Sequence, residues 1–423
     1  MCRREDCGLE IQLAYGHKKI PLRIDDRRVI CVLHPGRPGA VRDSVETIRK
    51  AMADPISSPR LRETVRRGQQ VVIVTSDITR PCPTHLMLPE VVRELNEAGV
   101  PDDNILVVFG LGIHRGHTPE ERRRLVGKEM FNRLRCVDSD PANVVKVGVT
   151  RRGTPVEVFR PVAEAGFRIC LGNIDPHYFA GYSGGGKAIM PGVCSRASIQ
   201  ANHGRMLEAG ATAGCVEGNP VREDIDEAAS LVGVDFILNV IMDESKRVVY
   251  AVAGDMLAAH REGCRLADTL YKVPIPALAD VVVACAGGHP KDVNLYQAQK
   301  ALDNAQLAVK PGGTVVLVAS CTEGLGEDTF ERWIAEATSP DDLLNRIRCG
   351  FELGGHKAAA VARVAKKARI LLVSDLPEEV VRRAWMEPYA SVEEALEAAL
   401  GAGRPDAKIV LMPYAGGTLP HVC

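Results

Sequence analysis

Residues 71–112 read VVIVTSDITRPCPTHLMLPEVVRELNEAGVPDDNILVVFGLG. Two short apolar runs rich in valine and isoleucine, at 71–77 and 105–112, flank a stretch with the composition of a helix. Strands that alternate with helices favour a parallel sheet, because each helix returns the chain to the edge where the next strand begins. This segment therefore predicts an α/β fold.

The same alternation of strand and helix patterns extends along the whole chain. Further strands are predicted at 167–175, 235–242, 247–254, 281–288, 313–320, 368–374 and 407–413. The segment KVPIPALAD carries two prolines, which predicts a boundary near residues 272–279. We therefore expect two α/β domains with largely parallel sheets, at 1–272 and 273–423, and an active-site cleft between them.

The composition narrows the class of protein. The 423 residues carry a formal net charge of −1, so no overall field draws the chain to nucleic acid or to a membrane. No apolar run approaches the ~20 residues that span a bilayer, and the start MCRREDCGLE lacks the apolar stretch of a signal peptide. The thirteen cysteines form no C-x-x-C pair. We expect a cytoplasmic protein with reduced thiols and without nucleic-acid or membrane partners.

Polar side chains follow the predicted strands at their carboxyl ends. Asp77 and Arg80 come after the first strand quoted, His114 after the second and His177 after the third, while Glu323 follows a strand of the second half. Open α/β sheets bind their ligands outside the carboxyl ends of the strands. These residues are therefore candidates for a site, although a surface ion pair is an equal alternative for Asp77 with Arg80.

The stretch GYSGGGKA at 181–188 resembles a phosphate-binding loop with one position changed. Its spacing fits G-x-x-x-x-G-K-[ST] except at the last position, where Ala188 has no hydroxyl for Mg²⁺. The backbone of Gly184, Gly185 and Gly186 offers N–H groups that suit a phosphate. Three interpretations stay open: a nucleotide loop without its metal ligand, a tight turn with an exposed lysine, or another chemistry at Lys187.

Three histidines lie at strand ends or beside this glycine loop. They are His114 in GIHRGHTPEE, His177 in DPHYFAGY and His203 in ANHGRM. Imidazole titrates near neutrality and binds nickel, copper or zinc when neutral, so each could be a base or a metal ligand. A solvated or structural histidine is the alternative at each position. His117 is interpreted as a supporting or surface group, and His85 as part of a helix start.

The segment NLYQAQKA at 294–301 provides a second set of candidates. Tyr296 or Gln297 shares a helical face with Lys300 at i, i+3 or i+4 spacing. This set becomes informative only together with the motifs of the first half.

Five motifs together resemble a known family. SDITRP, GIHRGHTPEE, DPHYFAGYSGGGKAIMPG, NHGRM and NLYQAQKA are similar to segments of the nickel-pincer lactate racemase family of 2-hydroxyacid racemases and epimerases. The resemblance runs from about residue 10 to residue 420. The lysine of the glycine loop, ten residues after a histidine and followed by another histidine, is its most specific feature.

The resemblance implies a covalent cofactor. In that family the loop lysine forms a thioamide bond to a pyridinium-3,5-bisthiocarboxylic acid mononucleotide nickel complex, so Lys187 is the expected attachment point. No Mg²⁺ hydroxyl is then required, which fits Ala188. His203 is expected to complete a square-planar nickel site. Asp77, together with the glycines 184–186, is expected to bind or orient the cofactor.

The resemblance also implies a reaction. Hydride leaves the substrate Cα and returns to either face of the 2-oxo acid. His114 and His177 are expected to act as base and acid for opposite enantiomers. Arg80 and Lys300 are expected to hold the carboxylate, and Gln297 with Tyr296 is expected to orient the substrate.

One departure concerns the substrate. Where lactate-acting members carry a tryptophan, this chain reads ELGGHKAAAVAR with His356 near that position. A polar ring there predicts a 2-hydroxy acid larger or more polar than lactate, including a sugar acid. The expected partners are this small acid and the enzymes that build the cofactor. The alternative is a catalytically silent nucleotide-binding regulatory or scaffold protein of the same fold, and a zinc hydrolase finds no H-E-x-x-H motif.

Overall fold

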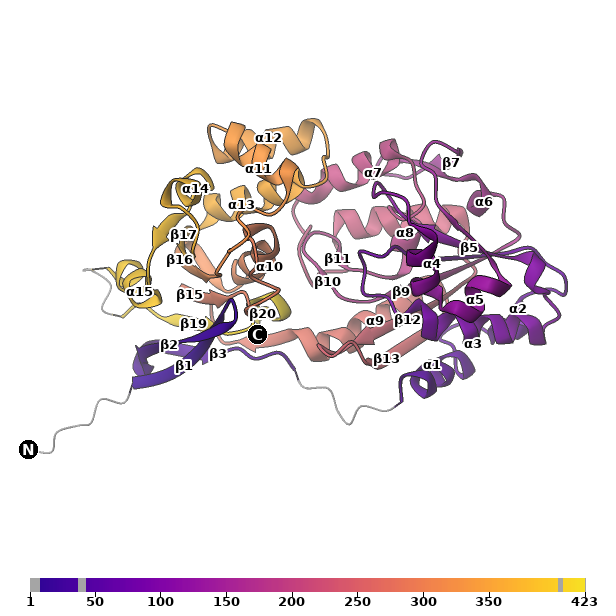
Figure 1. Ribbon diagram of the computed structural model, residues 1–423, viewed down its shortest axis with the longest axis horizontal. Coiled ribbons are helices and arrows are strands. Elements are labelled where there is room, and N and C mark those ends of the chain that lie inside the picture. Colours follow the sequence, from indigo (N-terminus) through magenta and orange to yellow (C-terminus); the bar gives the residue numbers. More distant parts are fainter. Residues whose placement is uncertain (1–7, 37–42, 402–405, 423) are drawn as a thin grey trace, which may run out of the picture. The chain divides into compact units, whose positions relative to one another are not determined.

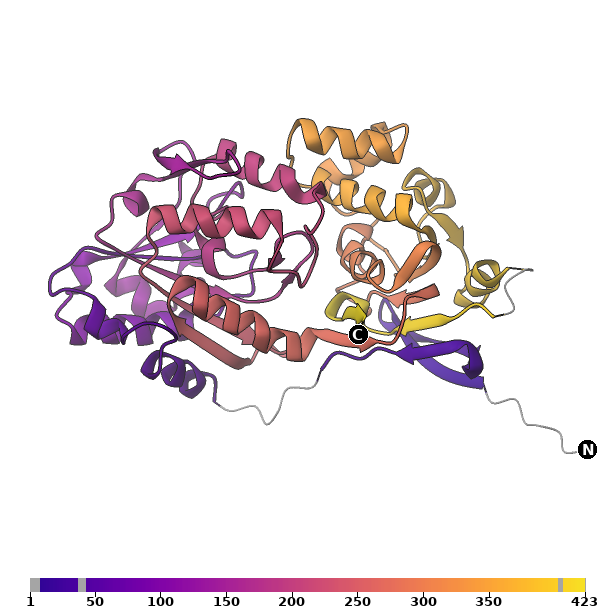
Figure 2. The same cartoon turned by 180° about the vertical axis from the view of Figure 1, so that it is seen from behind.

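The computed structural model describes residues 8–36, 43–401 and 406–422, and the chain divides into two compact units. The central unit comprises residues 37–270. The terminal unit combines residues 1–36 with residues 271–423. Figures 1 and 2 show helices packed around a sheet in each unit, as the alternation of patterns predicts.

The central unit is built on a six-stranded sheet with the order β13-β12-β9-β4-β5-β6. Its strands are β4 (Val71–Ser76), β5 (Ile105–Gly110), β6 (Arg135–Asp138), β9 (Phe167–Asn173), β12 (Phe236–Met242) and β13 (Val248–Gly254). Only β13 runs antiparallel to its neighbour. Two small antiparallel pairs accompany the sheet: β7 (Val144–Val149) with β8 (Pro155–Phe159), and β10 (Pro176–His177) with β11 (Gly181–Tyr182).

Helices connect these strands. They are α1 (Ser44–Ala53), α2 (Leu61–Thr64), α3 (Thr84–Glu97), α4 (Pro119–Val126), α5 (Lys128–Arg133), α6 (Arg160–Ala163), α7 (Arg196–His203), α8 (Pro220–Val232) and α9 (Met256–Tyr271), with short 3-10 turns η2 (Asp102–Asn104), η3 (Gly185–Ala188) and η4 (Gly204–Leu207). At α4 the sequence predicts the first turn correctly. Thr118 accepts the Glu121 N–H while the Glu121 carboxylate accepts the Thr118 N–H, which is a capping box.

The two faces of the central sheet are covered differently. Successive strand residues point to opposite faces, so Ile73, Val107 and Ile169 pack with α1 and α3 in one apolar cluster. The glycine segment η3 contacts β9, β4 and α8. The loop that carries Lys187 is therefore packed against the sheet itself, where side chains larger than glycine find little room.

The terminal unit holds a second six-stranded sheet, with the order β18-β17-β16-β15-β19-β3 and all neighbours parallel. Its strands are β3 (Val29–Val32), β15 (Ala279–Cys285), β16 (Val309–Val318), β17 (Arg369–Val373), β18 (Glu387–Tyr389) and β19 (Ile409–Met412). Two further pairs are β1 (Gly8–Tyr15) with β2 (Lys18–Asp25), antiparallel, and β14 (Lys272–Ile275) with β20 (Leu419–Val422), parallel.

Helices and the β1–β2 hairpin cover this sheet. The helices are α10 (Leu295–Ala305), α11 (Asp328–Glu336), α12 (Pro340–Cys349), α13 (Gly355–Lys367), α14 (Glu378–Arg383) and α15 (Val392–Leu400), with the 3-10 turns η1 (Asp26–Arg28) and η5 (Ala415–Gly417). Leu13 and Leu22 of the hairpin share an apolar cluster with Val283 and Val316 of the sheet and Leu396 of α15. Helices α10 and α13 contact β16 as well as each other.

The predicted domain boundary agrees with the structure at one end and differs at the other. The proline-containing segment near 272 coincides with the division between residues 270 and 271. Residues 8–32, however, belong to the terminal unit and not to a domain spanning 1–272. Strand β3 pairs with β19, and the β1–β2 hairpin packs on the sheet of β15 and β16. A four-residue strand such as VICV carries no local sign of which sheet it joins, because pairing is decided by partners distant in sequence.

Within the described ranges, every helix is too short or too polar to cross a lipid bilayer.

Candidate active site

The glycine loop begins with a tight two-stranded turn. Pro176 pairs with Tyr182, and His177 pairs with Gly181. Gly181 has φ +73°, and a Cβ at this position would lie 2.0 Å from the carbonyl oxygen of Cys215. The segment before the loop is thus a short antiparallel pair and not the buried parallel strand that precedes a nucleoside-triphosphate loop.

The three consecutive glycines are required by close packing. Gly184 has φ +78°, and its Cβ would lie 2.7 Å from Asn239 Oδ1; Gly185 has φ +56°, and its Cβ would lie 2.7 Å from His260. The Gly185 N–H already donates to Asn239 Oδ1 at 2.7 Å. The expectation that all three glycines present N–H groups to a phosphate is therefore wrong for Gly185. Gly186 is packed in the same way, with Ala229 3.0 Å from where its Cβ would be.

Three of the predicted site residues converge on one aromatic ring, that of Phe179. The ring centroids of His177 and His203 lie 4.5 and 5.0 Å from the Phe179 centroid, each in an edge-to-face arrangement. Lys187 Nζ lies 5.7 Å from the same centroid. We call Phe179, His177, Lys187 and His203 the Phe179 cluster. The residues that the sequence predicts as base, attachment point and metal ligand therefore lie together.

Lys187 sits in surroundings that disfavour its charged form. Burial, followed by the positive charges of Arg222 and Arg80, holds the pKa of Lys187 well below its usual range. Among the residues that the structure describes, no carboxylate is paired with its ammonium group. A neutral amine is a nucleophile, so Lys187 is suited to form a covalent bond.

His177 is kept neutral by the same surroundings. Burial, followed by the charges of Lys187 and Arg80, holds the pKa of His177 well below its usual value. The ring also stacks on Tyr178, with centroids 5.3 Å apart. A neutral imidazole at physiological pH can accept a proton, which is what a base must do.

His114 is oriented by a carboxylate. Its Nδ1 is hydrogen-bonded to Asp77, which is only 2% exposed and also accepts the Thr79 hydroxyl at 2.8 Å. Burial raises the pKa of Asp77, but the hydrogen bond and charge of His114, together with smaller contributions, lower it by more than burial raises it. The net shift of the Asp77 pKa is therefore downward. An ionised Asp77 holds the proton on Nδ1 and leaves Nε2 of a neutral His114 as the base. The structure therefore places Asp77 against the predicted base His114.

Arg80 links this pair to the Phe179 cluster. Its backbone N–H donates to Asp77 O at 3.1 Å in the turn after β4, and its side chain is exposed. No carboxylate of the described residues pairs with its guanidinium. Its charge is near enough to lower the pKa values of both His177 and Lys187. This guanidinium is available for an anionic ligand.

His203 is the last residue of α7, and its ring is oriented by the residue before it. Nδ1 lies 3.0 Å from Asn202 Oδ1. The Asn202 amide nitrogen donates to Val221 O at 3.2 Å and to Asp224 Oδ2 at 2.8 Å, so its oxygen faces His203. Nδ1 therefore carries the proton, and Nε2 has the lone pair that a metal would take.

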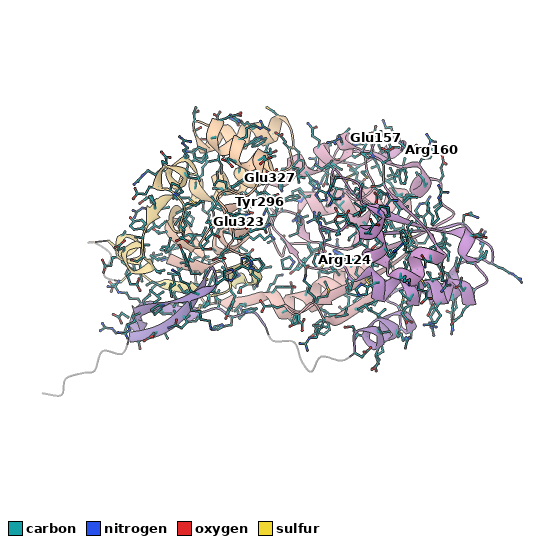
Figure 3. The ribbon with its side chains drawn as sticks, viewed as in Figure 1. Arg124, Glu157, Arg160, Tyr296, Glu323 and Glu327 are labelled. Carbon is teal, nitrogen blue, oxygen red and sulfur yellow. The ribbon has the colours of Figure 1, made fainter. Side chains whose placement is uncertain are left out.

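Both ends of α7 are tied to neighbouring elements. Ser195 caps its first turn and donates its hydroxyl to the Glu157 carboxylate of β8 at 2.6 Å; Figure 3 labels Glu157 and, three residues further on, Arg160 of α6. At the other end, Asp224 is fully buried and accepts the hydroxyls of Thr150 and Thr154 as well as the Asn202 amide. His203 is thus held by a network and not by one contact.

Arg222 holds the backbone of the glycine loop through hydrogen bonds. This side chain of α8 is fully buried and donates to the carbonyl oxygens of Ala180, Tyr182 and Gly184. Its one carboxylate partner, Asp226 at 3.2 Å, is shared with Arg261 at 2.8 Å. Arg261 also pairs with Glu217 at 3.0 Å, so the two guanidinium groups are matched by two carboxylates, and the remaining donors of Arg222 hold the backbone of the loop.

No group of three or more histidine, cysteine, aspartate or glutamate side chains within the described ranges is arranged to hold a metal ion. A metal that takes only His203 from the protein and its other ligands from a bound organic group is compatible with this arrangement.

The remaining predicted residues lie in the terminal unit, on and beside α10. Asn294 caps the helix, and exposed Lys300 donates to Gln297 Oε1 at 3.1 Å one turn away. Figure 3 labels Tyr296 close to Glu323 and Glu327, and the Tyr296 N–H donates to Leu325 O at 3.1 Å in the intervening loop. The shared helical face predicted for Gln297 and Lys300 is confirmed.

His356 is buried at the start of α13. Its Nδ1 accepts the Gly354 N–H at 3.0 Å, and its ring centroid lies 5.2 Å from that of Phe351. The next residue, Lys357, reaches α10: its Nζ donates to Tyr296 O at 2.5 Å and lies 3.9 Å from the Tyr296 ring centroid. Contact of His356 with substrate stays a prediction, and Lys357 is a cation beside Tyr296 that the sequence did not single out.

Two family models match the chain: the lactate racemase N-terminal domain over residues 15–214 and the lactate racemase C-terminal domain over residues 275–418. A protein of Lactiplantibacillus plantarum named lactate racemase is 32% identical over 421 residues, which cover 97% of this chain and 99% of that one. This chain belongs to the lactate racemase family. It is accordingly an isomerase, a racemase.

Further similarities agree with this assignment. The lactate racemase of Thermoanaerobacterium thermosaccharolyticum is 31% identical over 416 residues, or 95% of this racemase and 97% of the relative. The solved apoprotein structure of a lactate racemase from the same organism has a TM-score of 0.88, with 30% identity, 98% of this chain covered and 100% of the other. A Thermotoga maritima structure with 19% identity and a TM-score of 0.63, covering 91% of this chain and 100% of its own, shares the fold.

The racemase site also contains residues that sequence reasoning missed. Phe179 lies within DPHYFAGY, two residues after His177, and Asn202 directly precedes His203, so adjacency to a candidate was the available signal. Arg222 gave none, because an arginine within a helical pattern is usually exposed. In the central unit the structure brings the predicted residues together; the α10 set is described within its own unit.

Proposed function

We propose that this member of the lactate racemase family inverts the Cα of a 2-hydroxy acid by reversible hydride transfer to a nickel-pincer nucleotide joined to Lys187. The observation that supports this most is the Phe179 cluster, in which an amine of lowered pKa and two histidines surround one ring. A nucleotide-triphosphatase would need a hydroxyl at Ala188 and a preceding buried strand, and neither is present.

The residues present fit the pyridinium-3,5-bisthiocarboxylic acid mononucleotide nickel complex. Lys187 would hold it through the neutral amine, and His203 would ligate nickel through Nε2. When bound, this group supplies the acceptor and donor of hydride.

Proton transfer falls to the two histidines. Loss of hydride from Cα requires the substrate hydroxyl to lose its proton, and the two enantiomers present that hydroxyl differently. His114, with Asp77 on its Nδ1, would serve one hand, and His177 of lowered pKa would serve the other. For inversion, the other histidine must enter the cycle as the imidazolium and give its proton to the oxygen on the opposite face, so the two rings exchange protonation states in each turnover.

Cationic groups would hold the substrate carboxylate. Arg80 is exposed, near Lys187 and His177, and unpaired with any carboxylate of the described residues. Lys300 with Gln297, and Tyr296 beside them, are proposed as further substrate contacts. Each charged hydrogen bond of this kind contributes about 1.5–3 kcal/mol.

The substrate is proposed to be a 2-hydroxy acid other than, or in addition to, lactate. The named relatives are lactate racemases. His356 lies near the position where the family resemblance implies a tryptophan, and Lys357 adds a cation beside Tyr296. A more polar substrate suits these groups. We propose a cytoplasmic setting together with the enzymes that build the cofactor.

Chiral chromatography tests the proposal. The protein is produced with and without the cofactor-building enzymes, and single enantiomers of lactate, larger 2-hydroxy acids and sugar acids are offered. We expect inversion only with the cofactor-loaded protein, and best with an acid other than lactate. No inversion of any acid by protein whose Lys187 is shown to be modified would contradict the reaction, and an unmodified, inactive protein would favour the silent binding protein.

A further inference from the structure

Two histidines of GIHRGHTPEE each have a carboxylate on Nδ1. His114 is hydrogen-bonded to Asp77, and His117 Nδ1 lies 2.7 Å from Asp138 Oδ1. His114 is partly exposed, whereas the side chain of His117 is 1% exposed. The two pairs therefore have different surroundings, and only the first can meet a substrate.

His117 joins the loop after β5 to the loop after β4. The backbone N–H of Ile78 donates to His117 Nε2 at 3.1 Å. A backbone amide can only donate, so Nε2 must carry a lone pair. The proton of the neutral ring is then on Nδ1 and is donated to Asp138. Both ring nitrogens are engaged, which excludes His117 as a base toward substrate.

Asp138 is held in place by two other donors. Its Oδ2 accepts the His117 backbone N–H at 2.8 Å and Arg122 Nη2 at 2.8 Å. Burial raises the pKa of Asp138, but the hydrogen bonds of His117 and Arg122 outweigh this and lower it. The ionised carboxylate therefore accepts at both oxygens. The His117 ring also packs edge-to-face on the Phe109 ring, with their centroids 5.2 Å apart, and this contact further restricts its orientation.

The anchored residue, Ile78, lies between Asp77 and Arg80. Within this loop the Arg80 N–H donates to Asp77 O at 3.1 Å and the Thr79 hydroxyl donates to Asp77 Oδ1 at 2.8 Å, while the Ile78 N–H ties the loop to His117. We propose that His117, in the Nδ1–H form imposed by Asp138, is a positioning residue that fixes the Asp77–Arg80 loop and thereby aims the His114 base and the Arg80 guanidinium. This inference rests on the proposed function for its kinetic consequence but not for its geometry.

Nitrogen NMR of apoprotein selectively labelled with ¹⁵N-histidine tests the geometry directly. The signals of His117 are identified by their loss in His117→Gln. We expect the Nδ1–H tautomer in the wild type. In Asp138→Asn, the remaining oxygen is drawn to the Arg122 and His117 backbone donors, so the new amide nitrogen faces Nδ1 and drives the proton to Nε2. A wild-type ring with its proton on Nε2 would overturn the proposal.

Kinetics of the cofactor-loaded enzyme test the consequence. His117→Phe and Asp138→Asn should each lower kcat/KM about 10²-fold, the size expected for a misplacement near 1 Å, with KM raised as well as kcat lowered because Arg80 is displaced. His117→Gln, which keeps an acceptor for Ile78, should recover most of the loss. His85→Phe, at an exposed histidine of α3, is the matched control.

The two failures are distinguishable. Full activity with an unchanged KM in folded His117→Phe would refute positioning while leaving the racemase intact. If the wild type inverts no 2-hydroxy acid, the proposed function fails, and the apoprotein spectra still decide the tautomer. Thermal melting of each variant separates loss of the fold from loss of position: a variant as stable as the wild type but impaired supports the proposal, and recovery by Phe but not by Gln contradicts it.

Discussion

Each unit is built on a six-stranded sheet, but most candidate residues of the central unit are buried, whereas Lys300 of the terminal unit is exposed. In the central unit the candidate site lies in buried surroundings: Asp77 is 2% exposed, and the pKa values of Lys187 and His177 are both lowered by burial. In the terminal unit Lys300 is exposed, and its partner Gln297 lies on the same helix. Similar architecture therefore supports two kinds of polar site.

This difference indicates a division of work. Burial removes water and shifts pKa values, which suits covalent bonding and proton transfer. An exposed ammonium on a helix keeps an ordinary hydration shell and suits reversible binding of an anion. We therefore expect changes in the central unit to affect chemistry and changes on α10 to affect affinity.

The largest expected effect is on the two histidines of the central unit. His114→Ala and His177→Ala should each lower racemisation about 10²–10⁴-fold in both directions, because a full cycle needs one base and one acid. Each variant should still form 2-oxo acid from one enantiomer, and a different one in each case. Trapping the oxo acid from separate enantiomers measures this. The same enantiomer reacting in both variants would defeat the assignment, and His85→Ala is the control.

A smaller effect, on nickel affinity, is expected from Asn202, which contacts His203. Asn202→Leu removes the acceptor that fixes the His203 tautomer, so nickel affinity should fall about 10–100-fold, the size seen for such supporting groups. Nickel content is measured by elemental analysis on loaded, folded protein. Asn345→Leu, at an exposed asparagine of α12, is the control. An unchanged nickel content in the Asn202 variant would contradict the claim that Asn202 orients His203 for nickel binding.

On α10 the effect should fall on binding. Lys300→Ala removes one charged hydrogen bond to the substrate carboxylate, so KM should rise about 10-fold while kcat changes little. Steady-state kinetics with the preferred acid gives both constants. Lys310→Ala removes another lysine of the terminal unit, which pairs with Asp280. An equal change of KM in the two variants would contradict a specific role of Lys300 in substrate binding.

Replacing Lys187 should raise the free energy of unfolding of the apoprotein at neutral pH. Because the folded pKa lies below the unfolded value of ~10.4, the unfolded chain binds the proton more readily, and wild-type stability falls as pH drops below that value. Lys187→Met carries no such charge, so it should be more stable than the wild type at neutral pH. The gain should vanish above the unfolded pKa. Denaturant unfolding across pH measures it, and a loss of stability at neutral pH would contradict a buried, destabilised amine.

Local patterns were enough to predict much of the fold. Strand β4 was expected at 71–77 and spans Val71–Ser76. The N-cap at Thr118 was predicted from Glu121, three residues further on. Both depend on neighbours in sequence. The placement of the β1–β2 hairpin in the terminal unit was not predictable, because it is decided by contacts with strands more than 250 residues away, such as those of β1 with β15.

The same limit applied to the site. The histidines and Lys187 were predicted because their residue types carry chemistry. Their supports were not: Asp224 is 22 residues from Asn202, and Asp138 is 21 from His117, distances at which no periodicity operates. The glycines 184–186 were taken as an open cradle, whereas close contacts with Asn239, His260 and Ala229, respectively, leave little room for a larger side chain.

The modification state of Lys187 decides whether this lysine carries the cofactor. Protein made together with the cofactor-building enzymes is digested, and the peptide that contains Lys187 is weighed beside the same peptide from protein made without them and from Lys187→Arg. We expect an added mass on this lysine alone, present only in active protein and absent from the variant, which should also be inactive. Full racemase activity with an unmodified Lys187, or in the Lys187→Arg variant, would contradict it.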